Sequence, residues 1–184
     1  MTDSIPKCMD SYTVGSLTIA PALVLAPMAG LTDATFRRVV RRCGGVGLVV
    51  SEILSSEGLV RGTMRSEEYL RIGKDEHPVA LQLSGSDPGH MAEAAKRCAD
   101  EGADIVDINM GCPAHKITKG MCGVALLRDT RQAAAVAGAV VKAVSIPVTV
   151  KMRLGWSESE ITFIEVAKAL VDEGVAGLAL HART

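Results

Sequence analysis

Asp107-Ile108-Asn109-Met110-Gly111-Cys112-Pro113 is the stretch of sequence that decides the fold. It continues an apolar run that starts at Ile105, and a short apolar run of this kind is typical of a buried β-strand. The tripeptide Gly-Cys-Pro continues neither a strand nor a helix, so the strand is predicted to end there. The thiol of Cys112 is therefore expected at the mouth of a strand, where it can take part in chemistry.

The same pattern recurs along the chain. Further buried strands are predicted at residues 22–27, 46–53, 79–83, 148–154 and 177–181, with a weaker short strand at residues 16–19. Helices are predicted between them, at residues 33–42, 88–102, 129–144 and 161–173. Apolar strands that alternate with helices imply βαβ units and a parallel sheet.

Two parallel architectures compete for this pattern. A doubly wound dinucleotide fold would need a Gly-x-Gly-x-x-Gly turn after its first strand, and the turn Pro27-Met28-Ala29-Gly30 is not one. Polar or reactive residues instead recur at the carboxyl ends of the strands, which is where an eight-stranded barrel builds its site. The predicted fold class is α/β, a parallel (β/α)8 TIM barrel truncated after about six strands. Residues 1–15 are expected to be an N-terminal tail, and residues 16–184 a partial barrel domain.

Composition limits the classes of function. A formal net charge of −1 gives no global attraction to nucleic acid, so a polyanion would have to be held by a local basic patch. The first 15 residues lack a basic start, and Pro21 and Pro27 interrupt the next apolar run, so neither a signal peptide nor a membrane span is expected. The five cysteines contain no Cys-x-x-Cys pair and are expected to be reduced thiols of a cytoplasmic protein, with no metal site.

Five motifs in order resemble those of the tRNA-dihydrouridine synthases. These are flavin-dependent enzymes with an eight-stranded barrel and a C-terminal helical domain. The motifs lie at residues 26–33, 81–85, 107–113 with Lys116, 150–155 and 180–184. The resemblance runs from about Gly15 onward and implies the N-terminal portion of such an enzyme. The family's seventh and eighth strands, which hold the flavin phosphate, and its helical RNA-binding domain have no counterpart in this sequence, so we expect a fragment or a truncated reading frame.

The resemblance implies a reaction. NADPH would reduce FMN, and reduced FMN would deliver a hydride to a uracil ring of tRNA, giving 5,6-dihydrouridine. Cys112 would be the general acid that protonates the second carbon of the double bond. A thiol suits this role because its ordinary pKa of roughly 8.5 leaves it protonated at neutral pH. The alternative is that Cys112 is a small buried hydrophobic residue, as free cysteines usually are. Cys122 is interpreted as loop packing.

The resemblance also implies a flavin side to the site. Its residues would be Pro27, Met28, Ala29, Gln82, Lys151 and His181. Lys151 interrupts a buried apolar strand and needs an anionic partner, which the electron-rich pyrimidine edge of the flavin would supply. The alternatives are an ordinary turn at residues 27–29, a solvent-facing Gln82, a lysine that extends to water, and a His181 that is simply a hydrogen-bonded core residue.

Asn109 and Arg153 resemble the residues that bind the flipped uracil, and Lys116 and Lys119 would contact tRNA phosphates. The alternatives are a surface salt bridge for Arg153 and solvated loop lysines. Residues 36–42 place four arginines on one helix, which indicates either an RNA patch or, more commonly, a solvated charged face.

Two other functions remain open on the sequence. One is an FMN barrel dehydrogenase that acts on a free pyrimidine, of the dihydroorotate or dihydropyrimidine type. The other is a non-catalytic remnant that keeps the motifs by descent. The motif Gly111-Cys112-Pro113 followed by Lys116, which resembles that of the tRNA enzymes, favours the RNA enzyme.

Overall fold

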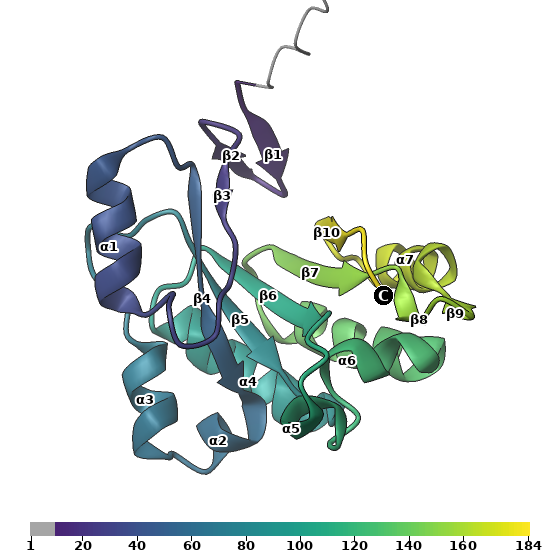
Figure 1. The fold of residues 1–184 in the computed structure, drawn as a ribbon. Coiled ribbons are helices and arrows are strands. Elements are labelled where there is room, and N and C mark those ends of the chain that lie inside the picture. Colours follow the sequence, from purple (N-terminus) through teal and green to yellow (C-terminus); the bar gives the residue numbers. More distant parts are fainter. Residues whose placement is uncertain (1–9) are drawn as a thin grey trace, which may run out of the picture.

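A six-stranded parallel sheet forms the centre of the molecule in the computed structural model, which describes residues 10–184 (Figure 1). The strand order is β3-β4-β5-β6-β7-β10, so each strand pairs with the one before it in the chain's succession of βα units. The strands are β3 (Val24–Leu25), β4 (Leu48–Ser55), β5 (Val79–Ser84), β6 (Ile105–Met110), β7 (Val148–Arg153) and β10 (Gly177–His181). All six predicted barrel strands are confirmed, and the sheet curls as part of a barrel.

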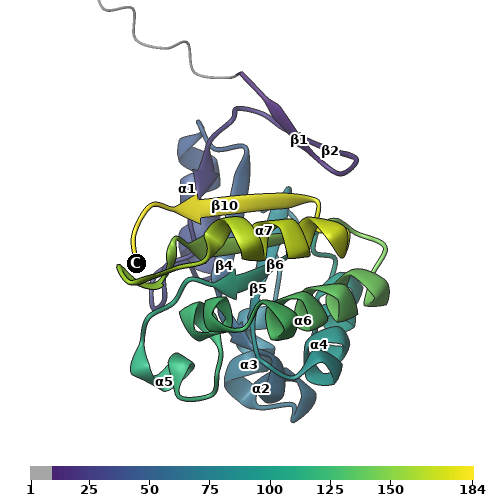
Figure 2. The same cartoon turned by 90° about the vertical axis from the view of Figure 1, so that its right-hand side faces the viewer.

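Helices cover the outer face of the sheet. They are α1 (Ala34–Cys43), α4 (Pro88–Asp100), α6 (Thr130–Ala143) and α7 (Phe163–Asp172), and Figure 2 shows the last three in succession along one side. Asp33, Asp87 and Asp129 cap the first three by accepting a hydrogen bond from a backbone N–H in the first turn. Between these helices and the sheet lies the larger apolar core, which includes Leu81, Ile108 and Val150.

Several short elements were not predicted. They are the helices α2 (Ser56–Val60), α3 (Met64–Leu70) and α5 (His115–Thr118), a 3-10 helix η1 (Gly123–Arg128), and the hairpin of β8 (Gly155–Ser157) with β9 (Glu160–Ile161). Each is too short to show a clear helical or alternating period, and α2 and α3 lie in a polar stretch for which no helix or strand was predicted.

An antiparallel hairpin of β1 (Tyr12–Val14) and β2 (Leu17–Ile19) covers the amino-terminal end of the barrel interior. Val14 and Ile19 are buried and pack with Leu48, Ala80 and Ile105, which lie near the starts of β4, β5 and β6. We expected residues 1–15 to be a tail, but residues 12–14 of that range form strand β1. Residues 1–9 lie outside the described part of the chain. Because the hairpin closes the amino-terminal end, the interior opens toward the carboxyl ends of the strands.

The two edges of the sheet, β3 and β10, are not joined to each other. Leu178 and Leu180 of β10 are exposed, as are Ile164 and Val171 of the neighbouring helix α7. Such an apolar edge is uncommon on a closed domain. The sheet is accordingly an open, truncated barrel, as predicted.

The arginine-rich helix α1 is held against the sheet by a buried ion pair. Arg37 is 1% exposed, and its Nε lies 2.5 Å from Oε2 of Glu76, which is itself fully buried. The same guanidinium donates to the carbonyl oxygens of Thr32 and Arg71, at 3.0 and 3.2 Å. Three acceptors, from Thr32, Arg71 and Glu76, thus meet at one side chain.

Arg41 also points inward, where it donates to the carbonyl oxygens of Val46, Gly47, Glu76 and Pro78. Arg38 and Arg42 instead pair with Asp75 at the surface. The prediction of an RNA patch on this helix is therefore wrong for Arg37 and Arg41, and the alternative of a solvated charged face holds only for Arg38 and Arg42. Helical spacing shows which arginines share a face of α1, but it does not show which face packs against the sheet.

We expect Arg37→Met to lower the free energy of unfolding by about 3–5 kcal/mol, because it leaves the carboxylate of Glu76 buried without its charge partner. The matched control is Arg38→Met, whose partly exposed ion pair is worth about 0–1 kcal/mol. Urea denaturation of the two variants measures the difference. Equal losses would show that the buried pair does not hold α1.

Candidate active site

Polar side chains line the inner face of the three central strands. Successive residues of a strand point to opposite faces, so alternate residues share the inner face. These are Gln82 and Ser84 of β5, Asp107 and Asn109 of β6, and Thr149, Lys151 and Arg153 of β7. The strand register places Gln82 opposite Asp107, Asp107 opposite Thr149, and Asn109 opposite Lys151. The sheet therefore gathers this polar group in one place near the carboxyl ends.

A continuous chain of hydrogen bonds joins these residues to the loop that carries the thiol. Oγ1 of Thr149 donates to Oδ1 of Asp107 at 2.6 Å, and Nε2 of Gln82 donates to Oδ2 at 2.6 Å. Nδ2 of Asn109 donates to Oε1 of Gln82 at 2.8 Å. Oδ1 of Asn109 then accepts the backbone N–H of Cys112 at 3.0 Å. The three central strands are thus tied together immediately below Cys112.

Among the four hydrogen-bonded side chains of Thr149, Asp107, Gln82 and Asn109, that of Asp107 is the ionisable one. It is 6% exposed, and its burial raises the pKa of the carboxyl group, an effect that the hydrogen bonds from Thr149 and Gln82 and the nearby charge of Lys151 oppose. Two donors and one cation surround a carboxylate here, so the site supplies what a buried anion requires.

Cys112 follows the end of β6 and is partly exposed, so the alternative of a fully buried hydrophobic residue is wrong. Its carbonyl oxygen accepts the backbone N–H of Val124 at 3.1 Å. Gly123 makes this approach possible, because its φ is +62° and a Cβ there would lie 2.6 Å from the Cys112 oxygen. The thiol loop is consequently fixed from both sides, by Asn109 and by η1.

Cys122 follows ten residues later, just before η1. Its Sγ lies 3.1 Å from the carbonyl oxygen of Gly120, and burial raises the pKa of the Cys122 thiol. These contacts agree with the interpretation as loop packing.

Arg153 reaches across to the Cys112 loop. Its Nε donates to the carbonyl oxygen of Gly111 at 2.7 Å and its Nη1 to that of Thr184 at 2.6 Å. Among residues 10–184 it forms no ion pair with an Asp or Glu side chain, so the surface salt bridge to such a side chain that was the alternative is not formed. One guanidinium therefore connects the loop after β6 with the segment after β10.

His181 pairs in register with Arg153 at the end of β10 and is exposed, so it is not a buried core residue. Desolvation and the neighbouring charges of Lys151, Arg153 and Arg183 lower the pKa of His181. A histidine among cations favours the neutral form, which can accept as well as donate a hydrogen bond.

The turn after β3 is fixed by two side chains. Oγ1 of Thr32 accepts the backbone N–H of Met28 at 3.0 Å, and Oε2 of Glu52 accepts that of Gly30 at 2.7 Å. Within this turn Met28 and Ala29 are exposed. The segment is thus a tied turn with an accessible surface.

Pro27 and Lys151 both line a cavity of about 300 Å³ inside the curled sheet. Asp107 and Thr149 line it from the central strands and Tyr12 from the hairpin. The two edges of the sheet, β3 and β10, and the strands between them therefore face one interior space.

The structure brings most of the expected site residues to the carboxyl ends of the strands. Gln82 is fully buried with both polar atoms engaged, so it does not face solvent, and Asn109 binds the loop backbone. Lys116 is exposed on α5, three residues after Pro113, and makes no ion pair in residues 10–184. The roles expected for these residues toward flavin, base and phosphate stay predictions.

Sequence reasoning assigned no role to Asp107, Thr149 or Glu52. The signal for the first two was present, because polar residues at every second position interrupt otherwise apolar strands. Glu52 gave no such signal, since its contact with Gly30 depends on a register shift in β4.

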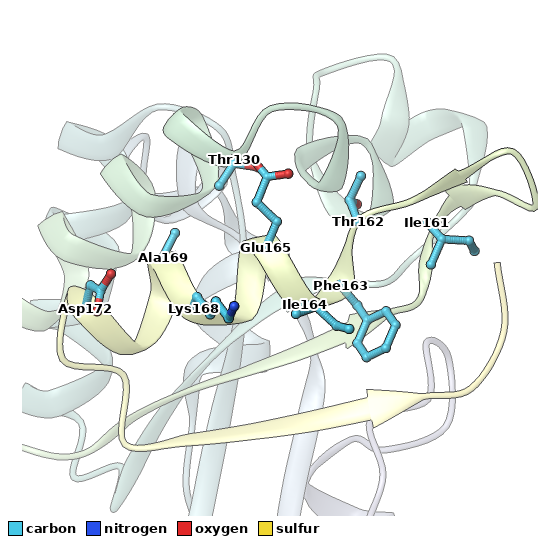
Figure 3. A pocket seen from close by; sticks show the side chains of 9 residues that line it. All are labelled: Thr130, Ile161, Thr162, Phe163, Ile164, Glu165, Lys168, Ala169 and Asp172. Carbon is cyan, nitrogen blue, oxygen red and sulfur yellow. The ribbon is translucent and has the colours of Figure 1, made fainter.

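A second hollow, of about 530 Å³, lies along the outside of α7 (Figure 3). Its carboxylate Glu165 accepts a hydrogen bond from Thr130 at 2.9 Å, and the other lining residues include Phe163, Ile164 and Lys168. It lies on the helical layer, so we place no chemistry there.

Over the same described range, no group of three or more His, Cys, Asp or Glu side chains could hold a metal ion. The helices of residues 10–184 are all too short or too polar to cross a membrane.

The fold matches solved structures of morphinone reductase. A variant in complex with tetrahydroNAD superimposes with a TM-score of 0.70 at 15% identity, over 96% of this chain and 73% of that one. A second structure, also in complex with tetrahydroNAD, gives 0.67 at 16% identity, over 96% and 74%. At this level of identity the likeness concerns the fold.

Curated relatives match over nearly the whole chain. The tRNA-dihydrouridine synthase B of Pseudomonas aeruginosa is 43% identical over 176 residues, which are 96% of this chain and 53% of that protein. A probable tRNA-dihydrouridine synthase of Rhizobium leguminosarum bv. phaseoli is 46% identical over 168 residues, 91% of this chain and 52% of that protein. The chain spans about half the length of these relatives.

The family model described as dihydrouridine synthase (Dus) matches residues 24–184, from the first barrel strand through the segment that follows β10. That range contains the polar chain of β5–β7 and the Cys112 loop. With this match, the chain belongs to the dihydrouridine synthase family.

Proposed function

We propose that this chain supplies the catalytic thiol and part of the flavin site of an enzyme that reduces uridine in tRNA to 5,6-dihydrouridine, with NADPH as reductant and FMN as cofactor. The observation that carries the proposal is Cys112, which the hydrogen bond from its N–H to Asn109 fixes at the carboxyl end of β6. Family membership supplies the substrate class, because the matched relatives are named as tRNA-dihydrouridine synthases. A tRNA substrate and reduced thiols agree with a cytoplasmic protein.

The residues present fit a flavin. The cavity has a mainly apolar wall with one cation, Lys151, beside the hydrogen-bonded carboxyl group of Asp107, and such a wall suits a ring system that is mainly apolar and carries an electron-rich edge. The chain of hydrogen bonds leaves one N–H on each of the amides of Gln82 and Asn109, and these are donors for carbonyl oxygens. We propose that Pro27, Met28, Ala29, Gln82, Lys151 and His181 hold the FMN, which when bound and reduced supplies the hydride.

The protein's part in the reaction is to hold the base and supply a proton. Reduction of the uracil double bond adds a hydride to one carbon and a proton to the other. The Cys112 thiol gives up that proton as the carbon takes on negative charge, and the resulting thiolate is reprotonated from solvent. Asn109 and Arg153 flank Cys112 and present N–H donors to the carbonyl edge of the flipped base.

The tRNA backbone would approach from the side of α5. Lys116 and Lys119 are both exposed there and lie within seven residues of Cys112. With a net charge of −1, the chain depends on such local cations for contact with phosphates.

We expect Lys151→Met to weaken FMN binding by about tenfold or more, because it removes the cation beside the flavin's electron-rich edge. Lys168→Met, on the outside of α7, is the control and should bind as the parent does. Flavin fluorescence quenching measures both dissociation constants. A purified parent protein that is colourless and takes up no FMN would favour the non-catalytic interpretation.

Cys112→Ala should lower the rate of dihydrouridine formation by about 10²–10⁴-fold, the usual contribution of a general acid. Cys122→Ala should keep the parent's rate, since that thiol packs within its own loop. The measurement is dihydrouridine content of unmodified tRNA after incubation with FMN and NADPH. Equal rates for the two variants would remove Cys112 from the role of acid, and turnover of free uracil without tRNA would indicate a pyrimidine reductase.

A further inference from the structure

We propose that Asp107 is a positioning residue that, through the side chains of Gln82 and Asn109, fixes the direction of both amides and the turn that carries Cys112. The inference rests on the proposed function, in which Cys112 gives a proton to the base. Asp107 itself lies beneath the reacting groups and acts only through its neighbours.

The direction of the hydrogen-bond chain is set at the thiol end. The backbone N–H groups of Gly111 and Cys112 can only donate, and both point at the same atom of Asn109, at 3.3 and 3.0 Å. That atom must be the oxygen, Oδ1, so the amide nitrogen of Asn109 faces Gln82. The facing atom of Gln82 must then be its oxygen, and its nitrogen faces Asp107.

This order requires an acceptor at the far end, and Asp107 is the group that provides one. Its Oδ2 takes the Gln82 N–H, while Oδ1 takes the hydroxyl of Thr149. The hydroxyl bond from Thr149 is 2.6 Å long, which is within the range of hydroxyl bonds to a charged acceptor. The carboxyl group therefore anchors an oriented chain whose last member is the Cys112 N–H.

Without that acceptor the N–H that Gln82 gives to Asp107 would be buried without a partner, and only the single bond from Asn109 would hold the direction of Gln82. A reversed Gln82 would point an N–H at the N–H of Asn109, and a reversed Asn109 would point N–H groups at the backbone of the turn. A reversed Gln82 therefore favours a reversed Asn109, and reversal of Asn109 breaks the contact that holds Cys112. It also changes which groups face the interior, from N–H donors to carbonyl acceptors.

Two substitutions distinguish the effect of the hydrogen-bond acceptor at position 107 from the effect of its charge. Asp107→Ala removes the acceptor. Asp107→Asn keeps one oxygen to accept from Gln82 and offers an amide N–H to the Thr149 hydroxyl, so the same direction can be maintained.

The direct readout is the hydrogen-exchange rate of the Cys112 backbone amide in the full chain, which depends on neither FMN nor tRNA. Asp107→Ala should raise this rate by about tenfold, as expected for the loss of one hydrogen bond of ordinary strength. Asp107→Asn should leave it near the parent's value. Unchanged exchange in the alanine variant would overturn the proposal.

The matched control is Asp104→Ala at the opposite end of the same strand. Oδ2 of Asp104 also holds two groups, the backbone N–H of Val79 and Nδ1 of His77, each at 2.7 Å. This variant should lose stability without raising the exchange rate of the Cys112 amide relative to neighbouring amides. A rise equal to that of Asp107→Ala would show a general loosening and would contradict a positioning role.

Kinetics on tRNA then connects the position of Cys112 with catalysis. Asp107→Ala should lower kcat by about tenfold with KM changed less, because a misplaced acid affects the transition state more than binding. Asp107→Asn should recover most of the rate. If the parent has no activity while amide exchange behaves as expected, the proposed function fails and the positioning by Asp107 stands. If exchange is unaffected while the parent is active, the reverse holds.

Discussion

A carboxylate buried inside a sheet must have hydrogen bonds to both of its oxygens, and much of this site follows from how Asp107 meets that requirement. Its two partners come from the strands on either side, Gln82 of β5 and Thr149 of β7. One of these bonds continues through Asn109 to the loop that carries the thiol. Burial of the Asp107 carboxylate would be costly without these bonds, and the same bonds determine where Cys112 lies.

The rest of the fold isolates this polar chain. The outer face of the sheet is packed under α4, α6 and α7, and the β1–β2 hairpin closes the amino-terminal end of the interior. Access is left at the carboxyl ends, where Cys112, Arg153 and His181 are found. The architecture alone thus restricts chemistry to one end of the strands, as in closed barrels.

Sequence patterns predicted what depends on local chemistry and periodicity. The six strands, the starts of the helices near Asp33 and Asp129 and the place of Cys112 after β6 all follow from neighbours in the chain. Contacts between segments that are distant in the sequence could not be predicted in this way. The buried pair of Arg37 with Glu76 joins residues 39 positions apart, and helical spacing is the same for a buried arginine as for a solvated one. The direction of the amides near Asp107 likewise depends on three strands at once, so it emerges only when their register is known.

The strand order has a consequence for how the chain acquires its structure. Each strand of the sheet lies beside the strand of the preceding unit, so the sheet can be extended one βα unit at a time as the polypeptide leaves the ribosome. Connections between successive units are local, which keeps the loop-closure cost of each addition small. The growing edge is always the newest strand, and in residues 10–184 that strand is β10, with Leu178 and Leu180 exposed. Synthesis from the amino terminus and assembly of the barrel thus proceed in the same direction.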